Sequence, residues 1–128
     1  MVAWSIGSTA RFAAYDWPQG QWKTDSTALG GTATSLEVAD GIVAGSTANG
    51  VFFAAYDPRA RQWKKGSALV SIGQFINLIN NDGIVAWTAG TTVQGRAYDP
   101  LSGTWKTHTV NLVATPFELK NSEGMMAW

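Results

Sequence analysis

An aspartate that recurs three times and a single histidine are the residues best suited to acid–base chemistry. Asp16, Asp57 and Asp99 each follow a tyrosine and are 41 and 42 residues apart. Regularly spaced carboxylates can act as general acid and base, but each of these aspartates stands where the chain is expected to turn, and there an aspartate caps backbone amides. We therefore interpret the three as turn residues. His108 is the only histidine, so one chain cannot build a histidine metal pair or a catalytic triad around it.

Other catalytic and metal-binding signatures are missing from the sequence. Glu118 and Glu123 have no equivalents in the other repeats that would make a carboxylate pair, and Gly30-Gly31 is not followed by the Lys-Ser/Thr of a phosphate-binding loop. The chain has no cysteine, which excludes thiolate metal ligands and a disulfide framework. We therefore predict that the protein is not an enzyme and has no metal site and no cofactor.

Four tryptophans fall outside the regular pattern described below and are candidates for ligand binding. Aromatic rings near loops can stack on the faces of sugars, and neighbouring guanidinium groups can donate hydrogen bonds to sugar hydroxyls. The candidate binding residues are Trp4, Trp17, Trp87 and Trp128, with Arg11 or Arg96 as the donors. The other interpretation, which we favour, is that these tryptophans fill irregular gaps in the core.

The composition restricts the class of protein. At 128 residues, with nine basic and nine acidic side chains, the chain has the size of one domain and no net charge. A neutral chain has no electrostatic attraction to nucleic acid or to an anionic membrane, and no run of about 18 apolar residues predicts a membrane span. Seven Trp and fourteen Gly predict an all-β domain of short strands and tight turns. The sequence does not indicate a cellular compartment.

The chain consists of three tandem copies of one repeat. In every copy Trp-Lys begins seven residues after the tyrosine of a Tyr-Asp pair. The repeated tyrosines are Tyr15, Tyr56 and Tyr98, and the repeated tryptophans are Trp22, Trp63 and Trp105. Because a residue that packs one repeat on the next recurs once per copy, we expect these aromatics, with the three aspartates, to be structural anchors. We predict one domain, 1–128, with repeats at approximately 1–41, 42–83 and 84–124 and a partial fourth repeat at 125–128.

Each repeat is predicted to contain four short strands. Phe117 and Leu119 alternate with charged residues, as on a half-buried strand. Asp40-Gly41 and Asp82-Gly83 supply the residues that a tight hairpin turn requires, and Asp57-Pro58 opens a second turn. A longer connection then leads from the last strand of one repeat into the next.

Two all-β architectures fit three repeats of this length, a β-propeller of four-stranded blades and a single-chain β-trefoil. The order of the motifs favours the propeller. Gly-Ile-Val-Ala-Trp at 83–87, Ala-Tyr-Asp-Pro at 97–100 and then Trp105 resembles the kelch repeat. The resemblance covers all three copies, although Trp17 stands in place of proline in the first and the kelch Gly-Gly pair is absent. It implies antiparallel blades packed around an axis.

Three blades are too few to close a ring, since propellers have about four to eight. Two chains would supply six blades and three chains nine, so we expect a homo-oligomer to complete the ring. Met1 to Trp4 and Met125 to Trp128 claim equivalent strand positions. Either one of these segments is displaced or the chain was excised from a longer array.

The leading hypothesis for function is a non-enzymatic, self-assembling scaffold that binds a protein or peptide through its loops, as the kelch resemblance implies. The alternative is a multivalent carbohydrate-binding module, in which the symmetry of the ring multiplies weak sites. A third hypothesis is a fragment or engineered array whose only evident property is assembly. We expect neither a nucleic acid partner nor a membrane.

Overall fold

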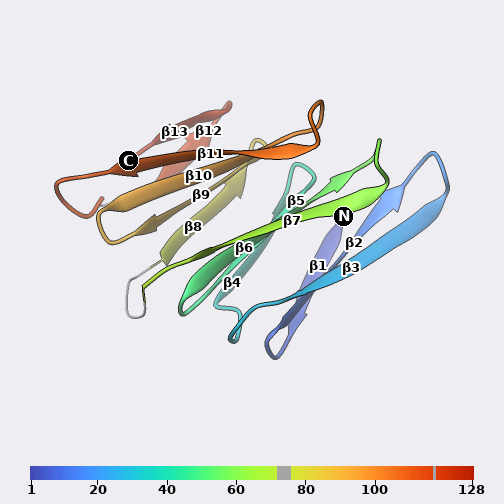
Figure 1. The fold of residues 1–128 in the computed structure, drawn as a ribbon, viewed down its shortest axis with the longest axis horizontal. Coiled ribbons are helices and arrows are strands. Elements are labelled where there is room, and N and C mark those ends of the chain that lie inside the picture. The colour runs from blue at the N-terminus through green and yellow to red at the C-terminus, as the bar shows by residue number, and fades with distance from the viewer. Residues whose placement is uncertain (72–75, 117) are drawn as a thin grey trace.

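The computed structural model describes residues 1–71, 76–116 and 118–128, and strands are the regular secondary structure of this part of the chain (Figure 1). The first sheet contains β1 (Val2–Ile6), β2 (Thr9–Asp16) and β3 (Gln21–Ala28). The second contains β4 (Ser35–Ala39), β5 (Ile42–Thr47), β6 (Gly50–Asp57) and β7 (Gln62–Leu69). The third contains β8 (Ile76–Asn81), β9 (Ile84–Ala89), β10 (Thr92–Asp99) and β11 (Thr104–Asn111), and a terminal hairpin contains β12 (Lys120–Ser122) and β13 (Met125–Ala127). The predicted all-β class is confirmed.

Each sheet is an open antiparallel meander in which every strand pairs with the next along the chain. The second and third sheets have four strands, whereas the first has three. As a result β1 lies at an edge of its sheet, while the corresponding strand of the second sheet, β5, is covered by β4. In the described residues no helix is long and apolar enough to cross a membrane.

The hydrophobic core lies between successive sheets. Figure 1 shows the sheets arranged in chain order, with the first sheet at one end and the terminal hairpin at the other. Phe12 of the first sheet packs in one cluster with Phe52 and Ala54 of the second. Phe53 of the second sheet packs in another cluster with Trp87 of the third. Because neighbouring residues of a strand point to opposite faces, β6 contributes to both junctions.

The predicted hairpin turns are confirmed by backbone geometry. Asp40 and Gly41 have φ angles of 48° and 80°, and Asp82-Gly83 repeats this pair with 50° and 75°. Glu123-Gly124 closes the terminal hairpin in the same way, with 52° and 76°. Two successive residues with positive φ are the requirement of a type I′ turn, which joins twisted antiparallel strands without splaying them.

The sheets do not coincide with the sequence repeats. β4 belongs to the predicted repeat 1–41, yet it pairs with β5 of the following repeat. In the same way β8 belongs to 42–83 and pairs with β9. Each four-stranded sheet therefore takes its first strand from the preceding repeat, so that backbone hydrogen bonds join consecutive repeats.

The alternating strand predicted around Phe117 and Leu119 is found only in its last part. Phe117 lies outside the described residues. Leu119 is buried, with 4% of its surface exposed, but strand pairing begins only at Lys120. The buried side chain packs with Ala86 and Val93, so it covers the outer face of the third sheet.

Candidate functional site

The repeated Tyr-Asp pair forms a hydrogen bond between neighbouring sheets. The hydroxyl of Tyr56 donates to Oδ2 of Asp16 at 2.9 Å, and the hydroxyl of Tyr98 donates to Oδ2 of Asp57 at 2.8 Å. In both cases the tyrosine belongs to the later sheet and the aspartate to the earlier one. The same donor and acceptor therefore meet at the junction between the first and second sheets and at the junction between the second and third.

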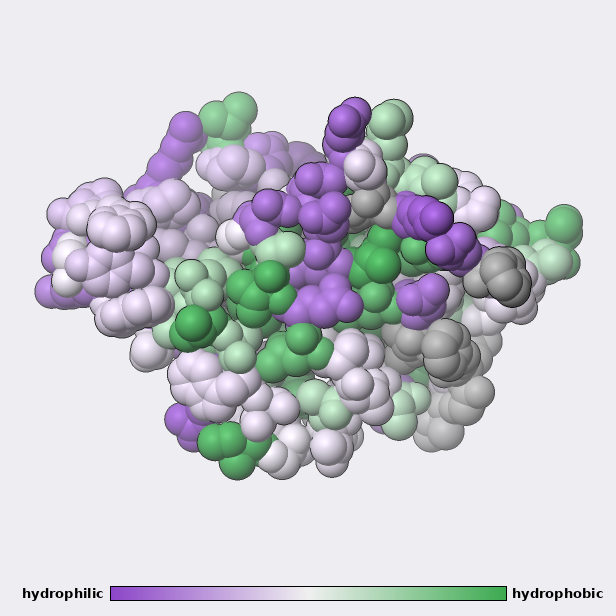
Figure 2. Space-filling model, turned by 180° about the vertical axis from the view of Figure 1, so that it is seen from behind, coloured by the Kyte–Doolittle hydropathy of each residue, from purple (hydrophilic) through white to green (hydrophobic). Residues whose placement is uncertain are grey.

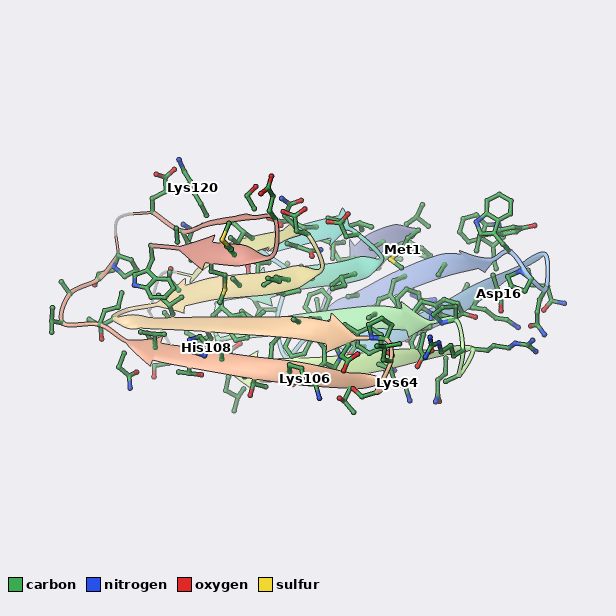
Figure 3. The ribbon with its side chains drawn as sticks, turned by 90° about the horizontal axis from the view of Figure 1, so that it is seen from above. Met1, Asp16, Lys64, Lys106, His108 and Lys120 are labelled. Carbon is green, nitrogen blue, oxygen red and sulfur yellow. The ribbon has the colours of Figure 1, made fainter. Side chains whose placement is uncertain are left out.

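The repeated Trp-Lys pair forms a second inter-sheet contact. Nε1 of Trp63 donates to the backbone carbonyl of Lys23, and Nε1 of Trp105 donates to that of Lys64, both at 3.1 Å. Figure 3 shows Lys64 and Lys106 at neighbouring positions of adjacent sheets. The rings of Trp63 and Trp105 also pack edge-to-face on the phenylalanines of the preceding sheet. Centroid distances are 4.5 Å for Phe12–Trp63 and 4.7 Å for Phe53–Trp105.

A third contact links the hairpin turns. Oδ2 of Asp40 accepts a hydrogen bond from the backbone amide of Asp82, and Oδ2 of Asp82 accepts one from the backbone amide of Glu123 at 2.7 Å. We refer to the Tyr–Asp, Trp–Lys and turn–turn hydrogen bonds together as the inter-sheet contacts. The Tyr–Asp and Trp–Lys bonds recur at the first–second and second–third junctions, whereas the turn–turn bonds recur at the second–third junction and between the third sheet and the terminal hairpin.

The ionisation of the Tyr–Asp pair suits a structural role. Burial and the hydrogen bond to Asp57 raise the pKa of Tyr98 to about 12. The pKa of Asp57 is lowered, mainly by the hydrogen bond from the backbone amide of Ala60, with a contribution from the Tyr98 hydroxyl. At neutral pH the tyrosine is therefore protonated and the aspartate charged, which makes a charge-assisted hydrogen bond rather than a proton-transfer pair.

The predicted turn-capping role is visible in two of the three aspartates. Oδ1 of Asp57 accepts hydrogen bonds from the amides of Arg59 and Ala60, at 2.9 and 3.0 Å. Oδ1 of Asp99 accepts hydrogen bonds from the corresponding amides of Leu101 and Ser102, at 2.9 and 3.3 Å.

Asp16 departs from this pattern. It is 2% exposed and its Oδ1 has no hydrogen-bond partner. The residue two positions later is Pro18, which has no amide hydrogen to donate, and the amide of the next residue, Gln19, donates to the backbone carbonyl of Asp16 at 3.2 Å. Pro18 stands two residues after its aspartate, whereas Pro58 and Pro100 each stand one residue after theirs. This difference was the sequence signal for the unpaired oxygen.

The inter-sheet contacts are incomplete at the two ends of the stack. On the first sheet, the Tyr15 hydroxyl and Trp22 Nε1 occupy the donor positions, and neither has a hydrogen-bond partner within the described part of the chain. On the third sheet, Asp99 and the carbonyl of Lys106 occupy the acceptor positions, and no tyrosine or tryptophan of the described residues reaches them. Asp99 accepts a hydrogen bond from the Ser102 hydroxyl at 2.7 Å, which lowers its pKa.

The outer face of the first sheet is apolar and exposed. Exposed fractions are 48% for Val2, 41% for Trp4, 64% for Ile6 and 55% for Trp22. The corresponding residues of β5 face the first sheet and are covered by it, with Val43 at 0% exposure. The exposed face therefore presents the same positions that are buried at an internal junction.

An aromatic pocket lies at the end of the first two sheets where the Tyr-Asp pairs are found. It has a volume of about 580 Å³. The pocket is lined by Met1, Ala14, Tyr15, Trp17, Trp22, Gly41, Tyr56 and Pro58. Trp17, which stands in place of the prolines of the other copies, is 83% exposed and packs edge-to-face on Tyr15 at 4.7 Å.

The structure does not bring the four candidate tryptophans together. Trp87 is fully buried, stacked on Phe53 at 6.2 Å and covered by the guanidinium of Arg96 at 5.1 Å, so it offers no surface to a ligand. Trp4 and Trp17 are exposed on the first sheet, where Trp4 and Arg11 line a separate pocket. Trp128, 48% exposed, follows β13 at the other end of the stack.

A groove with both polar and apolar lining residues runs along the first strands of the later sheets. It has a volume of about 390 Å³ and includes Glu37 of β4, Asn80 of β8 and Lys120 of β12. Burial raises the pKa of Glu37, and the side-chain amide of Asn80 donates to the backbone carbonyl of Glu37 at 3.4 Å.

Figure 2 shows hydrophobic and hydrophilic side chains mixed on the face opposite to that of Figure 1.

Within the described ranges, no group of three or more His, Cys, Asp or Glu residues is placed to hold a metal ion. His108 is exposed on β11, far from Asp16 (Figure 3). The features that recur are therefore the inter-sheet contacts. Their unused donors lie on the exposed outer face of the first sheet, and their unused acceptors lie on the third sheet, whose outer face is partly covered by Leu119 and the terminal hairpin. Comparison with known proteins supplies no relative, since no family model, curated protein or solved structure matches the chain.

Proposed function

We propose that this chain is a non-enzymatic interaction scaffold of the β-propeller type that assembles from several copies. The observation that carries the proposal is the repetition of the Tyr–Asp and Trp–Lys hydrogen bonds at both sheet junctions. When the same donor and acceptor atoms join each sheet to the next, every sheet is related to its neighbour by nearly the same rotation and translation. Four-stranded sheets related in this way are the blades of a propeller.

The open meander of each sheet also supports a propeller over a single-chain β-trefoil. Residues of β6 pack on the sheets at both sides of it, as expected for a blade with two neighbours. The kelch resemblance of the Tyr-Asp-Pro and Trp motifs agrees with this arrangement. In the proposal, these motifs hold the blades together and do not bind a ligand.

Ring closure requires more blades than one chain holds. Propellers close with about four to eight blades, so two chains with three blades each fall inside this range and three chains fall outside it. We therefore propose a dimer. The turns that carry the Tyr-Asp pairs would then be presented twice on one face of the ring, where a protein or peptide partner could bind both copies.

The test is the mass in solution, measured by light scattering after size-exclusion chromatography over a range of protein concentrations. A species of twice the 13.7 kDa of one chain is the expected result. A species of 13.7 kDa at every concentration would contradict the multi-chain ring. Three times that mass would retain self-assembly and replace the six-bladed ring with a nine-bladed one.

Carbohydrate binding is a second candidate, because Trp17 projects beside the aromatic pocket with 83% of its surface exposed. An exposed indole ring can stack on the apolar face of a sugar. Screening on a glycan array is the test, with Trp17→Ala as the comparison. Retention of a specific glycan by the original chain and its loss in the variant would favour this function over the protein scaffold.

A further inference from the structure

We propose that the outer faces of the first and third sheets are complementary, so that a second copy of this chain docks its first sheet on the third sheet of the first copy. In this complex, β1 of the incoming copy replaces β13 as the partner of β12. The inference rests on the proposed self-assembly and specifies its polarity, its contact atoms and the strand that moves.

The first argument is the polar match between the two faces. Tyr15 and Trp22 occupy the positions of Tyr56 and Trp63, whose partners are Asp16 and the Lys23 carbonyl. Asp99 and the carbonyl of Lys106 occupy the positions of these partners. For the Tyr–Asp and Trp–Lys contacts, the unused donors therefore lie on the first sheet and the unused acceptors on the third. This arrangement predicts head-to-tail association, in which unlike faces meet.

The second argument is the apolar surface of the first sheet. Val2, Trp4 and Ile6 alternate along β1 on its outer face and are 41–64% exposed. At the internal junction, Val43 and Thr47 stand at the positions of Val2 and Ile6 and are 0% and 3% exposed. Docking against another sheet would remove these apolar side chains from water. The equivalent side chains of β5 are already buried in this way at the junction between the first and second sheets.

The third argument concerns size complementarity at the proposed junction. The position of Phe12 and Phe53 is taken in the third sheet by Gly95, whose missing side chain leaves room now filled by Met126 of β13. The position of Gly45, which faces the preceding sheet, is taken in the first sheet by Trp4. A small residue on the receiving face and a large one on the docking face match each other, provided that Met126 leaves.

The identity of the moving strand follows from sequence and pairing. Met125-Met126-Ala127-Trp128 and Met1-Val2-Ala3-Trp4 differ at one position, so β1 can form the backbone hydrogen bonds that β13 forms with β12. β1 pairs with β2 over five residues, whereas β13 pairs with β12 over three. Displacing β13 therefore costs fewer hydrogen bonds than displacing β1, and β12 regains the same number from the incoming copy.

This exchange predicts the register between copies. Lys120 pairs with Ala127 in one chain, and Ala3 is the counterpart of Ala127, so Lys120 of one copy should lie opposite Ala3 of the other. Within one chain β1 and β12 belong to opposite ends of the stack (Figure 1). The exchanged sheet would contain β12 of one copy with β1, β2 and β3 of the other, which gives it the four strands of the second and third sheets.

Cysteine cross-linking tests the register directly, because the chain has no cysteine of its own. The variant carrying Ala3→Cys and Lys120→Cys should form a disulfide-linked dimer under mild oxidation, seen on a non-reducing gel as a shift to twice the one-chain mass. Facing residues of an antiparallel pair are within the distance that a disulfide spans. The two single-cysteine variants, which lack the facing thiol, are the controls and should remain at the one-chain mass.

A second variant covers the case in which the cross-link is hindered by geometry. Val2→Asp places a charge on the exposed outer face and should weaken dimerisation at least tenfold, whereas Val38→Asp, at a valine of β4 that is 41% exposed, should not. A dimer that neither cross-links nor responds to Val2→Asp would overturn this interface and leave the proposed self-assembly intact. A chain that is monomeric at all concentrations would overturn both.

Discussion

The hydroxyl of Tyr98 donates a 2.8 Å hydrogen bond to the carboxylate of Asp57, one sheet earlier in the chain. The Asp57 carboxylate also accepts hydrogen bonds from the amides of Arg59 and Ala60, which stabilise the turn after β6. One carboxylate therefore stabilises both a local turn and the packing of two sheets. The contact explains why Tyr and Asp recur together at a constant step along the chain.

Tyr98→Phe removes this inter-sheet hydrogen bond and keeps the ring. A hydrogen bond to a charged group contributes about 1.5–3 kcal/mol, so we expect a loss of about 1.5 kcal/mol in the free energy of unfolding, at the low end because Tyr98 is only half-buried. Urea denaturation measures it. Tyr15→Phe is the matched control, since the Tyr15 hydroxyl has no hydrogen-bond partner among the residues that the structure describes. At concentrations where the chain is monomeric, this variant should change stability by less than about 0.5 kcal/mol. Equal losses in the two variants would contradict the role assigned to the Tyr98 hydroxyl.

The same pair predicts a limit to stability at high pH. The folded pKa of Tyr98 is about 12, above the value of about 10 for an unperturbed tyrosine. A raised folded pKa contributes stability that is complete below the unfolded value, so this contribution should fall as the pH rises from about 10 to about 12. The measurement is the free energy of unfolding against pH, and Tyr98→Phe should flatten the alkaline part of the curve.

At low pH, Asp57 should set the opposite limit. Its folded pKa is lowered, so its contribution is present above the unfolded value of about 3.9 and is lost as the pH falls through the folded pKa. Acid titration of Asp57→Ala against the original chain tests this. A low-pH decline of the same size in both proteins would show that Asp57 does not carry it.

Asp57→Ala should cost more than Asp16→Ala. Both variants lose the hydrogen bond from the tyrosine of the next sheet. Asp57 also caps two amides, whereas Oδ1 of Asp16 caps none, since Pro18 has no amide hydrogen and the amide of Gln19 donates to the Asp16 backbone carbonyl. Losing the additional capping bonds should cost about 1–2 kcal/mol more. Parallel urea denaturation of the two variants gives the difference, and a larger cost for Asp16→Ala would refute the explanation based on Pro18.

The proposed contact between copies predicts a coupling between Tyr15 and Asp99. Tyr15→Phe and Asp99→Asn should each weaken dimerisation about tenfold, the effect of losing about 1.4 kcal/mol. If the two side chains contact each other across the interface, the double variant should lose little more than either single variant. Dissociation constants from light scattering at graded concentrations measure this cycle, and fully additive losses would place the two residues in separate contacts.

Sequence alone was sufficient for the local elements of this protein. The alternation of apolar residues, the Asp-Gly pairs and the Tyr-Asp step predicted an all-β chain of repeated short strands and tight turns. These signals are local, because the side-chain period of a strand and the positive φ of a type I′ turn depend on residues close together in the chain. The roles of Asp57 and Asp99 as turn residues could be predicted for the same reason.

Tertiary structure decided which of these residues meet. The sequence placed the tryptophans in constant register, but only the packing of the sheets shows that Trp63 and Trp105 bond to lysine carbonyls of the preceding sheet. The packing of the sheets also gives two candidate binding residues different environments. Trp87 is buried between two sheets, whereas Trp17 is exposed on a turn. The physical reason is that burial and partner choice depend on residues about forty positions away, whose distance in space is fixed by how the sheets stack and not by local conformational preference.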